Sequence, residues 1–424
     1  MRPSVGAPMS EHRRVVITGL GMISALGNDV ETNWSRILRG ENGVGPITRF
    51  DPKDHPVKFA ASVQWDPLKH FTVPDQRKLD LFTMWALVAT DEALRDAGLE
   101  PAKEPEERRQ RIGSIIGTGI GGITAIEEQH REMLERGPRR ISPHFVPKIM
   151  ANAVSGQVAI RHGLQGTCFT TSSACASAGH AMGMAWRSIQ FGDSDVVVTG
   201  GAESATTPLS LGGFANMKAL STRNEDPASA SRPFDKDRDG FVMGEGAGIL
   251  VFEEYERARA RGARIYAEVK GYGSTDDAYH ITAPEESGLG PARALREALR
   301  HAKIPLEAVD YVNAHGTSTP YNDLIETRAI KAIFGAHAKK LAVSSTKSMI
   351  GHLLGASAAV ELVVTALSVH KGQVHPTRNY TTPDPECDLD YVPGAARELA
   401  VRNALSNSLG FGGHNVSICI GRPD

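Results

Sequence analysis

Short β-branched runs alternate with longer helical patterns along this chain. The hydrophobic periodicity predicts buried strands over 14–18, 112–116 and 195–199, and helices over 78–97 and 124–135. Glycines follow several of the predicted strands directly, at points where a strand turns toward a helix and the backbone needs conformational freedom. This alternation predicts an α/β fold, in which helices cover the faces of a sheet.

The second half of the chain repeats the pattern of the first. A strand predicted over 265–269 ends in Gly-Tyr-Gly, much as the strand over 14–18 ends in Gly-Leu-Gly. The segment 168–200 reads as strand, polar turn, small-residue helix and strand, and 341–372 begins with the same strand, polar turn and helix. We therefore expect two related α/β halves, 13–263 and 264–424, that pack tightly with their functional turns facing one another.

Length and composition limit the classes of function. The 424 residues exceed the usual size of one compact unit, which agrees with two halves. The 47 basic and 49 acidic residues nearly balance, so there is no electrostatic argument for a nucleic-acid binder. Four cysteines, at 168, 175, 387 and 419, are too scattered for a disulfide scaffold and lack the paired spacing of a zinc site.

The chain shows no targeting or membrane-spanning pattern. Met1–Arg14 is polar and lacks the apolar core of a signal peptide. No later stretch contains the roughly 18 uninterrupted apolar residues that a membrane span requires. We expect a soluble, cytoplasmic protein that does not insert into membranes.

Two motifs imitate ligand-binding loops. Residues 117–122 match the pattern G-x-G-x-x-G, but no second strand ending in an acidic residue follows about 20 positions on, so we interpret them as a tight turn. Residues 235–240 begin like a calcium-binding EF-hand loop, but the twelfth position is Gly246, where a bidentate Glu is needed. The alternating charges there indicate an internally paired structural turn instead.

Cys175 is the candidate nucleophile. It follows the β-prone run 168–171 and comes just before a helix of small residues. A thiol at a helix N-terminus meets unpaired N–H groups and the positive end of the helix dipole, so we expect a lowered pKa and a thiolate. Cys419, and also Cys168, fit a packing role better.

Two histidines and a lysine supply the rest of the candidate site. His315 follows a predicted strand over 311–313, and Lys347 and His352 bracket a turn into a helix that contains Glu361. An ammonium near two imidazoles disfavours their protonation, so we expect neutral hydrogen-bond donors, with the carboxylate orienting the lysine. A thiol beside such donors is suited to acyl chemistry.

Two other classes of function remain open on these residues. The separation of Cys175 from His315 is compatible with a papain-like cysteine hydrolase, although the Cys-Gly-Ser-Cys-Trp type of signature is absent. A non-catalytic binder of acyl chains is the second alternative.

Five motifs carry a resemblance to a known family. They are Ala-Cys-Ala-Ser at 174–177, the Arg-Pro-Phe-Asp-Lys-Asp-Arg-Asp-Gly run at 232–248, Asn-Ala-His-Gly-Thr-Ser-Thr-Pro at 313–320, Ser-Ser-Thr-Lys-Ser-Met-Ile-Gly-His at 344–352, and Gly-Phe-Gly-Gly-His-Asn at 410–415. The chain resembles β-ketoacyl-[acyl carrier protein] synthases of the elongating type II kind from about Arg13 to Gly421. The order and spacing of all five motifs are kept.

The resemblance implies a thiolase fold, with two α/β halves in α-β-α-β-α layers, and a decarboxylating Claisen condensation that elongates acyl chains in fatty acid synthesis. Cys175 would hold the acyl chain as a thioester, and backbone N–H groups of Cys175 and Phe411 would form the oxyanion hole. His315 and His352 would hold the malonyl thioester oxygen. Lys347 and Glu361 would support the two imidazoles. No cofactor is expected, because the phosphopantetheine arm of acyl carrier protein brings both substrates.

The resemblance also assigns substrate contacts. Thr317 and Thr319 match positions that hydrogen-bond the phosphopantetheine arm, Phe411 matches a gate at the acyl pocket, and Ile120 falls on a pocket-lining position. Leu409 stands where many relatives have a second Phe, which leaves the chain-length preference open.

Partners and a cation follow from the same resemblance. Arg77 and Lys78 match a docking site for the acidic carrier protein, although a solvated helix start explains them equally well. A homodimer is expected. Asn313, Glu361, Ser406 and Asn407 match a structural monovalent-cation site. A ketosynthase of a type II polyketide system is the alternative within the fold.

Overall fold

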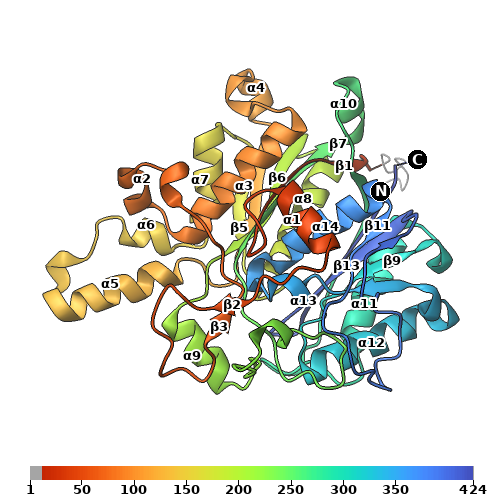
Figure 1. Cartoon of the computed structure of the whole chain (residues 1–424). Helices are drawn as coiled ribbons and strands as arrows, with labels where there is room; N and C mark the ends of the chain where they lie inside the picture. Colours follow the sequence, from red (N-terminus) through yellow and green to blue (C-terminus); the bar gives the residue numbers. More distant parts are fainter. Residues whose placement is uncertain (1–11, 424) are drawn as a thin grey trace, which may run out of the picture.

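The computed structural model describes residues 12–423 and is built around one ten-stranded sheet (Figure 1). In spatial order its strands are β10 (Ala342–Ser344), β9 (Tyr311–Asn313), β13 (Asn403–Gly410), β14 (His414–Gly421), β8 (Ala267–Asp276), β1 (Val15–Ile23), β7 (Gly246–Glu254), β6 (Val196–Glu203), β4 (Ile112–Gly117) and β5 (Cys168–Thr171). Two small pairs, β2 (Gly45–Pro46) with β3 (Phe59–Ala60) and β11 (Gln373–Val374) with β12 (Arg397–Glu398), lie outside this sheet.

The strand order contains an internal repeat. From the centre outward, one side reads β1, β7, β6, β4 and β5, and the other reads β8, β14, β13, β9 and β10. In each set the strands appear in the same chain order, with the first strand at the centre, the last strand next to it and the third strand at the edge. The predicted repeat of pattern between the two halves of the chain thus has a counterpart in the topology.

Helices pack on the faces of the sheet, and two of them form a central layer. They are α1 (Val30–Leu38), α2 (Val73–Lys78), α3 (Leu81–Ala97), α4 (Glu106–Arg109), α5 (Ile123–Arg136), α6 (Phe145–Ile149), α7 (Ala153–His162), α8 (Ser177–Gln190), α9 (Pro208–Asn216), α10 (Tyr255–Ala260), α11 (Leu289–Ala302), α12 (Pro320–Phe334), α13 (Lys347–Ile350) and α14 (Ser357–Lys371). α3 packs on β1 and β7, and α11 packs on β8 and β14. α8 and α14 contact each other and strands from both halves, so they form the central layer.

Small residues let the central helices approach the sheet. A Cβ atom on Gly248 of β7 would lie 2.6 Å from the backbone nitrogen of Val360 in α14, so only glycine fits there. The stretch Leu354–Lys371 is long and apolar enough to cross a membrane by composition, but 89% of it is buried within the described protein, as expected for a core helix.

The sequence placed most elements correctly but misjudged several ends. The helix expected over 78–97 begins at Leu81, because Leu79 and Asp80 are extended and Lys78 ends the separate helix α2. β1 continues to Ile23 and β6 to Glu203. Both strands are buried along their whole length, and the glycines within them were read as the ends of the strands. Residues 1–11 of the polar N-terminal segment lie outside the described part of the chain.

Candidate active site

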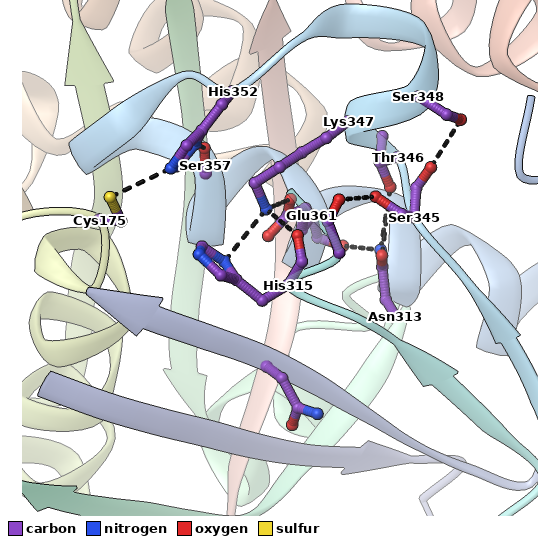
Figure 2. Close-up of polar contacts among 12 residues, drawn as sticks. Cys175, Asn313, His315, Ser345, Thr346, Lys347, Ser348, His352, Ser357 and Glu361 are labelled. Carbon is purple, nitrogen blue, oxygen red and sulfur yellow. Dashed lines mark hydrogen bonds and ion pairs between the residues drawn. The ribbon is translucent and has the colours of Figure 1, made fainter. Parts of the chain in front are cut away.

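Cys175 lies in the turn between β5 and α8, at the N-terminus of the central helix as the sequence predicts. Its Sγ atom is 3.1 Å from Nε2 of His352 (Figure 2). The backbone N–H groups of Phe411 and of Cys175 itself also face the sulfur. Ala174, just before the nucleophile, has a φ of 49°, in the left-handed region that few residues other than glycine adopt. The sulfur is therefore held among hydrogen-bond donors by a strained turn.

The expectation of a lowered thiol pKa is wrong for this structure. Burial raises the pKa of Cys175 to about 12, against the lowering effects of the Lys347 charge and the Phe411 N–H group. The thiol is buried, and loss of solvation penalises the thiolate more than the nearby donors stabilise it. The sequence shows the helix N-terminus but not how deeply the sulfur is buried. The packing role expected for Cys168 is also wrong, because Cys168 is exposed on β5, whereas Cys419 is buried as expected.

His352 has a defined tautomer. Its Nδ1 accepts a hydrogen bond from the backbone N–H of Leu354 at 3.2 Å and lies 2.8 Å from the hydroxyl of Ser357. Nδ1 therefore carries no proton, and Nε2–H is the donor directed at Cys175. Burial lowers the pKa of His352 well below its ordinary value, and the Lys347 charge lowers it further, so the ring is neutral.

His315 is oriented in the same way by the lysine. Nζ of Lys347 is 3.3 Å from Nδ1 of His315, which leaves Nε2–H as the free donor. The rings of His315 and His352 are 5.3 Å apart and nearly perpendicular, at 86°. Burial, then Lys347 and His352, lower the pKa of His315 well below its ordinary value. Both imidazoles are neutral donors, as expected.

Lys347 stands behind the two rings and does not line the cavity. Its ammonium donates to the carboxylate of Glu361, to the carbonyl oxygen of His315 at 2.7 Å, and to the His315 ring (Figure 2). Lys347 and Glu361 are each only 1% exposed. Burial raises the pKa of Glu361 to about 7, with the ammonium opposing that shift. All three ammonium hydrogens have acceptors, so the position of the lysine is fixed.

A cavity of about 350 Å³ connects these groups to the surface. Of the predicted site residues it is lined by Cys175, His315, His352, Thr317, Thr319, Leu409 and Phe411.

Three other predicted residues lie outside this cavity. Ile120 is not part of its lining, and its side chain is 38% exposed. Arg77 and Lys78 are exposed at the end of α2, and Arg77 lines a separate groove with Lys148 and Phe145. None of these three residues therefore lines the cavity that contains Cys175.

The residues expected to hold a cation lie close together in the core. Asn313 on β9 is paired in register with Ser406 on β13, and Asn407 follows directly. Oε2 of Glu361 is buried and has no hydrogen-bond partner among the described residues. A buried carboxylate oxygen without a partner suits a cation ligand, so Glu361 fits such a group. The side chain of Asn407 is instead held by Glu326 and Ser417.

Several residues of the site were missed in the sequence. Phe241 packs its ring 5.2 Å from the ring of His352, edge to face. Ser357 and the backbone of Leu354 fix the His352 tautomer. Phe241 lies inside one of the five motifs, and Ser357 follows His352 by about one turn, so the sequence could have placed both residues near the site. Nothing in the sequence indicated what either residue does there.

Comparison with known proteins identifies the family of this chain. Residues 12–258 match the family model for the N-terminal domain of beta-ketoacyl synthase, and residues 266–381 match that for its C-terminal domain. The chain is 51% identical over 409 residues to 3-oxoacyl-[acyl-carrier-protein] synthase 2 of Synechocystis, covering 96% of this chain and 98% of the relative. It is 50% identical over 413 residues, with the same coverage, to the protein of that name from Staphylococcus aureus strain COL.

Solved structures give the same result. A type II polyketide synthase acyl carrier protein in complex with its ketosynthase matches with a TM-score of 0.90 and 36% identity, covering 97% of this chain and 100% of the matched chain. A beta-ketoacyl synthase from Burkholderia phymatum matches with a TM-score of 0.89 and 35% identity at the same coverage. The fold is thus the expected thiolase fold. Both the sequence and the structure lead to one conclusion, that this chain belongs to the β-ketoacyl synthase family.

Proposed function

We propose that this protein condenses an acyl chain held on Cys175 with malonyl-carrier protein, releasing carbon dioxide and forming 3-oxoacyl-carrier protein in fatty acid elongation. The observation that carries the proposal is the juxtaposition of one thiol and two neutral imidazole donors: Sγ of Cys175 is 3.1 Å from His352, whose ring is 5.3 Å from that of His315. Relatives named 3-oxoacyl-[acyl-carrier-protein] synthase 2, about half identical over nearly the whole chain, support it.

The first step is acyl transfer to Cys175. The sulfur attacks the thioester carbonyl of the incoming acyl-carrier protein, the bond to the carrier sulfur breaks, and the thiol proton ends on the departing carrier thiol. The N–H groups of Cys175 and Phe411 that face the sulfur are placed to bind the oxyanion that forms. Since burial holds the thiol pKa near 12, the thiolate must form as the substrate arrives.

The second step is decarboxylation of the malonyl group. As the bond to the carboxylate breaks, its electrons pass to the thioester oxygen, where the Nε2–H groups of His315 and His352 donate to the developing enolate. The enolate carbon then attacks the acyl carbonyl on Cys175, and the sulfur leaves as a thiolate that takes up a proton from solvent to restore the thiol. Lys347 keeps Nδ1 of His315 unprotonated and thereby keeps the Nε2 proton directed at the substrate.

The cavity provides a route for the phosphopantetheine arm. The hydroxyls of Thr317 and Thr319 lie 2.9 Å apart on its wall and offer polar contacts to an amide-rich chain. Leu409 and Phe411, which also line the cavity, gate the acyl pocket. Arg77 and Lys78 are exposed, and a groove that contains Arg77, Lys148 and Phe145 offers charge and apolar surface for an acidic carrier protein.

Four further assignments belong to this proposal. Glu361, with Asn313, Ser406 and Asn407, holds a structural monovalent cation through its unpartnered carboxylate oxygen. A homodimer forms through β5, which is one of the two edge strands of the main sheet. The halves 13–263 and 264–424 are its structural units. A cytoplasmic location stays a prediction.

One assay distinguishes this function from its alternatives. Acyl-carrier proteins of varied chain length are incubated with malonyl-carrier protein, and products are identified by mass spectrometry together with carbon dioxide release. Condensation gives a 3-oxoacyl product and carbon dioxide. A cysteine hydrolase would instead release free acid without consuming malonyl groups, and an acyl-chain binder would do neither. Repeated extension to a polyketone would favour the type II polyketide reading.

A further inference from the structure

Glu203, the last residue of β6, carries a buried carboxylate that the proposed chemistry does not use. It is 0% exposed, and no salt bridge to it occurs among the described residues. Its two oxygens instead accept five hydrogen bonds. The donors are Oγ1 of Thr118 at 3.0 Å and the backbone N–H groups of Gly119 at 2.7 Å, Ile120 at 3.2 Å, Gly121 at 3.4 Å and Gly355 at 3.0 Å.

On one side Glu203 holds a loop that supports the nucleophile. The loop 118–121 follows β4, and the carbonyl of Gly119 accepts a hydrogen bond from the hydroxyl of Ser172 at 3.3 Å. A Cβ atom on Gly119 would lie 2.8 Å from the Glu203 carboxylate and 3.4 Å from the carbonyl of Ala174. The loop is thus in close contact with the strained turn that presents Cys175.

On the other side Glu203 holds the segment that orients His352. The N–H of Gly355 donates to the carboxylate, and the preceding Leu354 has a φ of 47°, in the left-handed region. The N–H of Leu354 is the group that donates to Nδ1 of His352. A hydrogen bond from the adjacent residue holds Leu354 in a conformation that it would not adopt on its own.

We propose that Glu203 is a positioning residue that sets the approach of His352 to Cys175, by fixing the loop 118–121 and the segment 352–355 on one carboxylate. These two segments come from different halves of the chain and meet at this side chain. A Cβ atom on Gly355 would lie only 2.1 Å from the Gly119 nitrogen, so the segments already touch as closely as glycines permit. The inference rests on the proposed condensation, whose geometry it deepens.

The five donors require an acceptor on both oxygens. A glutamine has the shape of glutamate but presents an NH₂ group in place of one oxygen. That group would face either the N–H of Gly355 and Gly119 or the three donors on the other oxygen, and like donors repel. One of the two segments must then move away.

The test is the Glu203→Gln variant, assayed with acyl-carrier protein and malonyl-carrier protein. We expect kcat for condensation to fall at least tenfold while KM for malonyl-carrier protein stays within twofold, because the cavity wall with Thr317 and Thr319 is untouched. The matched control is Glu253→Gln on β7, an equally buried carboxylate paired with Arg257 and Arg261. This control should lower Tm without changing kcat.

An unchanged kcat in a folded Glu203→Gln protein, with active wild type beside it, would overturn the positioning role and leave the condensation intact. Inactive wild type would instead refute the proposed function. Should Glu203→Gln fail to fold, Thr118→Val removes one donor and leaves the backbone donors in place. We expect that variant to lower kcat two- to fivefold at unchanged KM, and an unchanged kcat would again overturn the role.

Discussion

At the scale of single residues, the site is built from groups kept neutral by burial. Cys175, His315 and His352 each have a pKa moved away from its ordinary value in the direction that disfavours charge. The ion pair between Lys347 and Glu361 lies behind them and fixes the tautomer of His315, whereas the Leu354 N–H fixes that of His352. Such a site accepts negative charge when the substrate brings it, as a decarboxylation requires.

The raised thiol pKa predicts how Cys175 reacts with iodoacetamide. Because the folded thiol keeps its proton above the ordinary value of about 8.5, the rate should rise about tenfold for each pH unit from 6.5 to 9.5. Mass spectrometry of the peptide that contains Cys175 measures this rate, with Cys175→Ser as the blank. A plateau below pH 8 would show a thiolate already present and contradict the account.

The same shift predicts the pH dependence of stability. An unfolded Cys175 ionises near its ordinary value, whereas the folded thiol stays protonated to about pH 12. Its contribution to stability is therefore complete below about pH 8.5 and is lost as the pH rises toward 12. Urea unfolding should show a smaller decrease in stability between pH 8 and 10 for Cys175→Ser than for wild type. Equal decreases in the two proteins would contradict this sign.

Removing one partner of the buried ion pair should cost more than removing both. Lys347→Met leaves the Glu361 carboxylate without its ammonium, and such losses cost about 3–5 kcal/mol. The double variant Lys347→Met with Glu361→Leu should recover much of that stability, measured by urea unfolding, but not the activity, because Nδ1 of His315 has lost its donor. A single variant as stable as wild type would refute the coupling.

At the scale of elements, the sequence predicted which turns form the site but not how deeply the site is buried. Each functional turn follows a predicted strand, so Cys175 and His315 could be placed from hydrophobic periodicity and polar punctuation alone. The motif resemblance then supplied the roles. Burial of the sulfur, the accepting atoms around Lys347 and the five donors on Glu203 depend on contacts between segments far apart in the chain. No local pattern encodes these contacts, and Glu203 was missed for that reason.

The close packing of α14 on β7 gives a prediction at this scale. In Gly248→Ala, the new Cβ would meet the backbone nitrogen of Val360 at 2.6 Å, so α14 must shift and Tm should fall by several degrees. In the control Gly213→Ala, on α9, a Cβ meets nothing within 4 Å, and alanine should stabilise the helix by about 0.5–1 kcal/mol. Equal Tm values for the two variants would contradict the packing argument.

At the scale of the whole molecule, the two sets of strands meet at β1 and β8 and leave β5 and β10 at the two edges of the sheet. Figure 1 shows α8 and α14 between these sets, and both helices lead away from catalytic turns. The site therefore lies where the two halves join, and it needs side chains from each. The unpaired edge of β5 can bind the same strand of a second copy, as the proposed homodimer requires.

This edge gives a prediction about assembly. Light scattering should give the wild-type protein twice the 45.5 kDa of the chain. Cys168→Arg places a charge at an exposed position of the strand through which the copies are proposed to pair, so this variant should shift toward monomer. A monomeric wild-type protein would refute the assembly.

The central claim is that Cys175 carries the acyl chain, whereas His315 and His352 stabilise the enolate formed by decarboxylation. The most direct test measures acylation of Cys175 and carbon dioxide release from malonyl-carrier protein separately in His352→Ala. The account predicts that acylation remains measurable while carbon dioxide release falls at least a hundredfold, since one of the two enolate donors is gone. Loss of acylation with carbon dioxide release intact would contradict it.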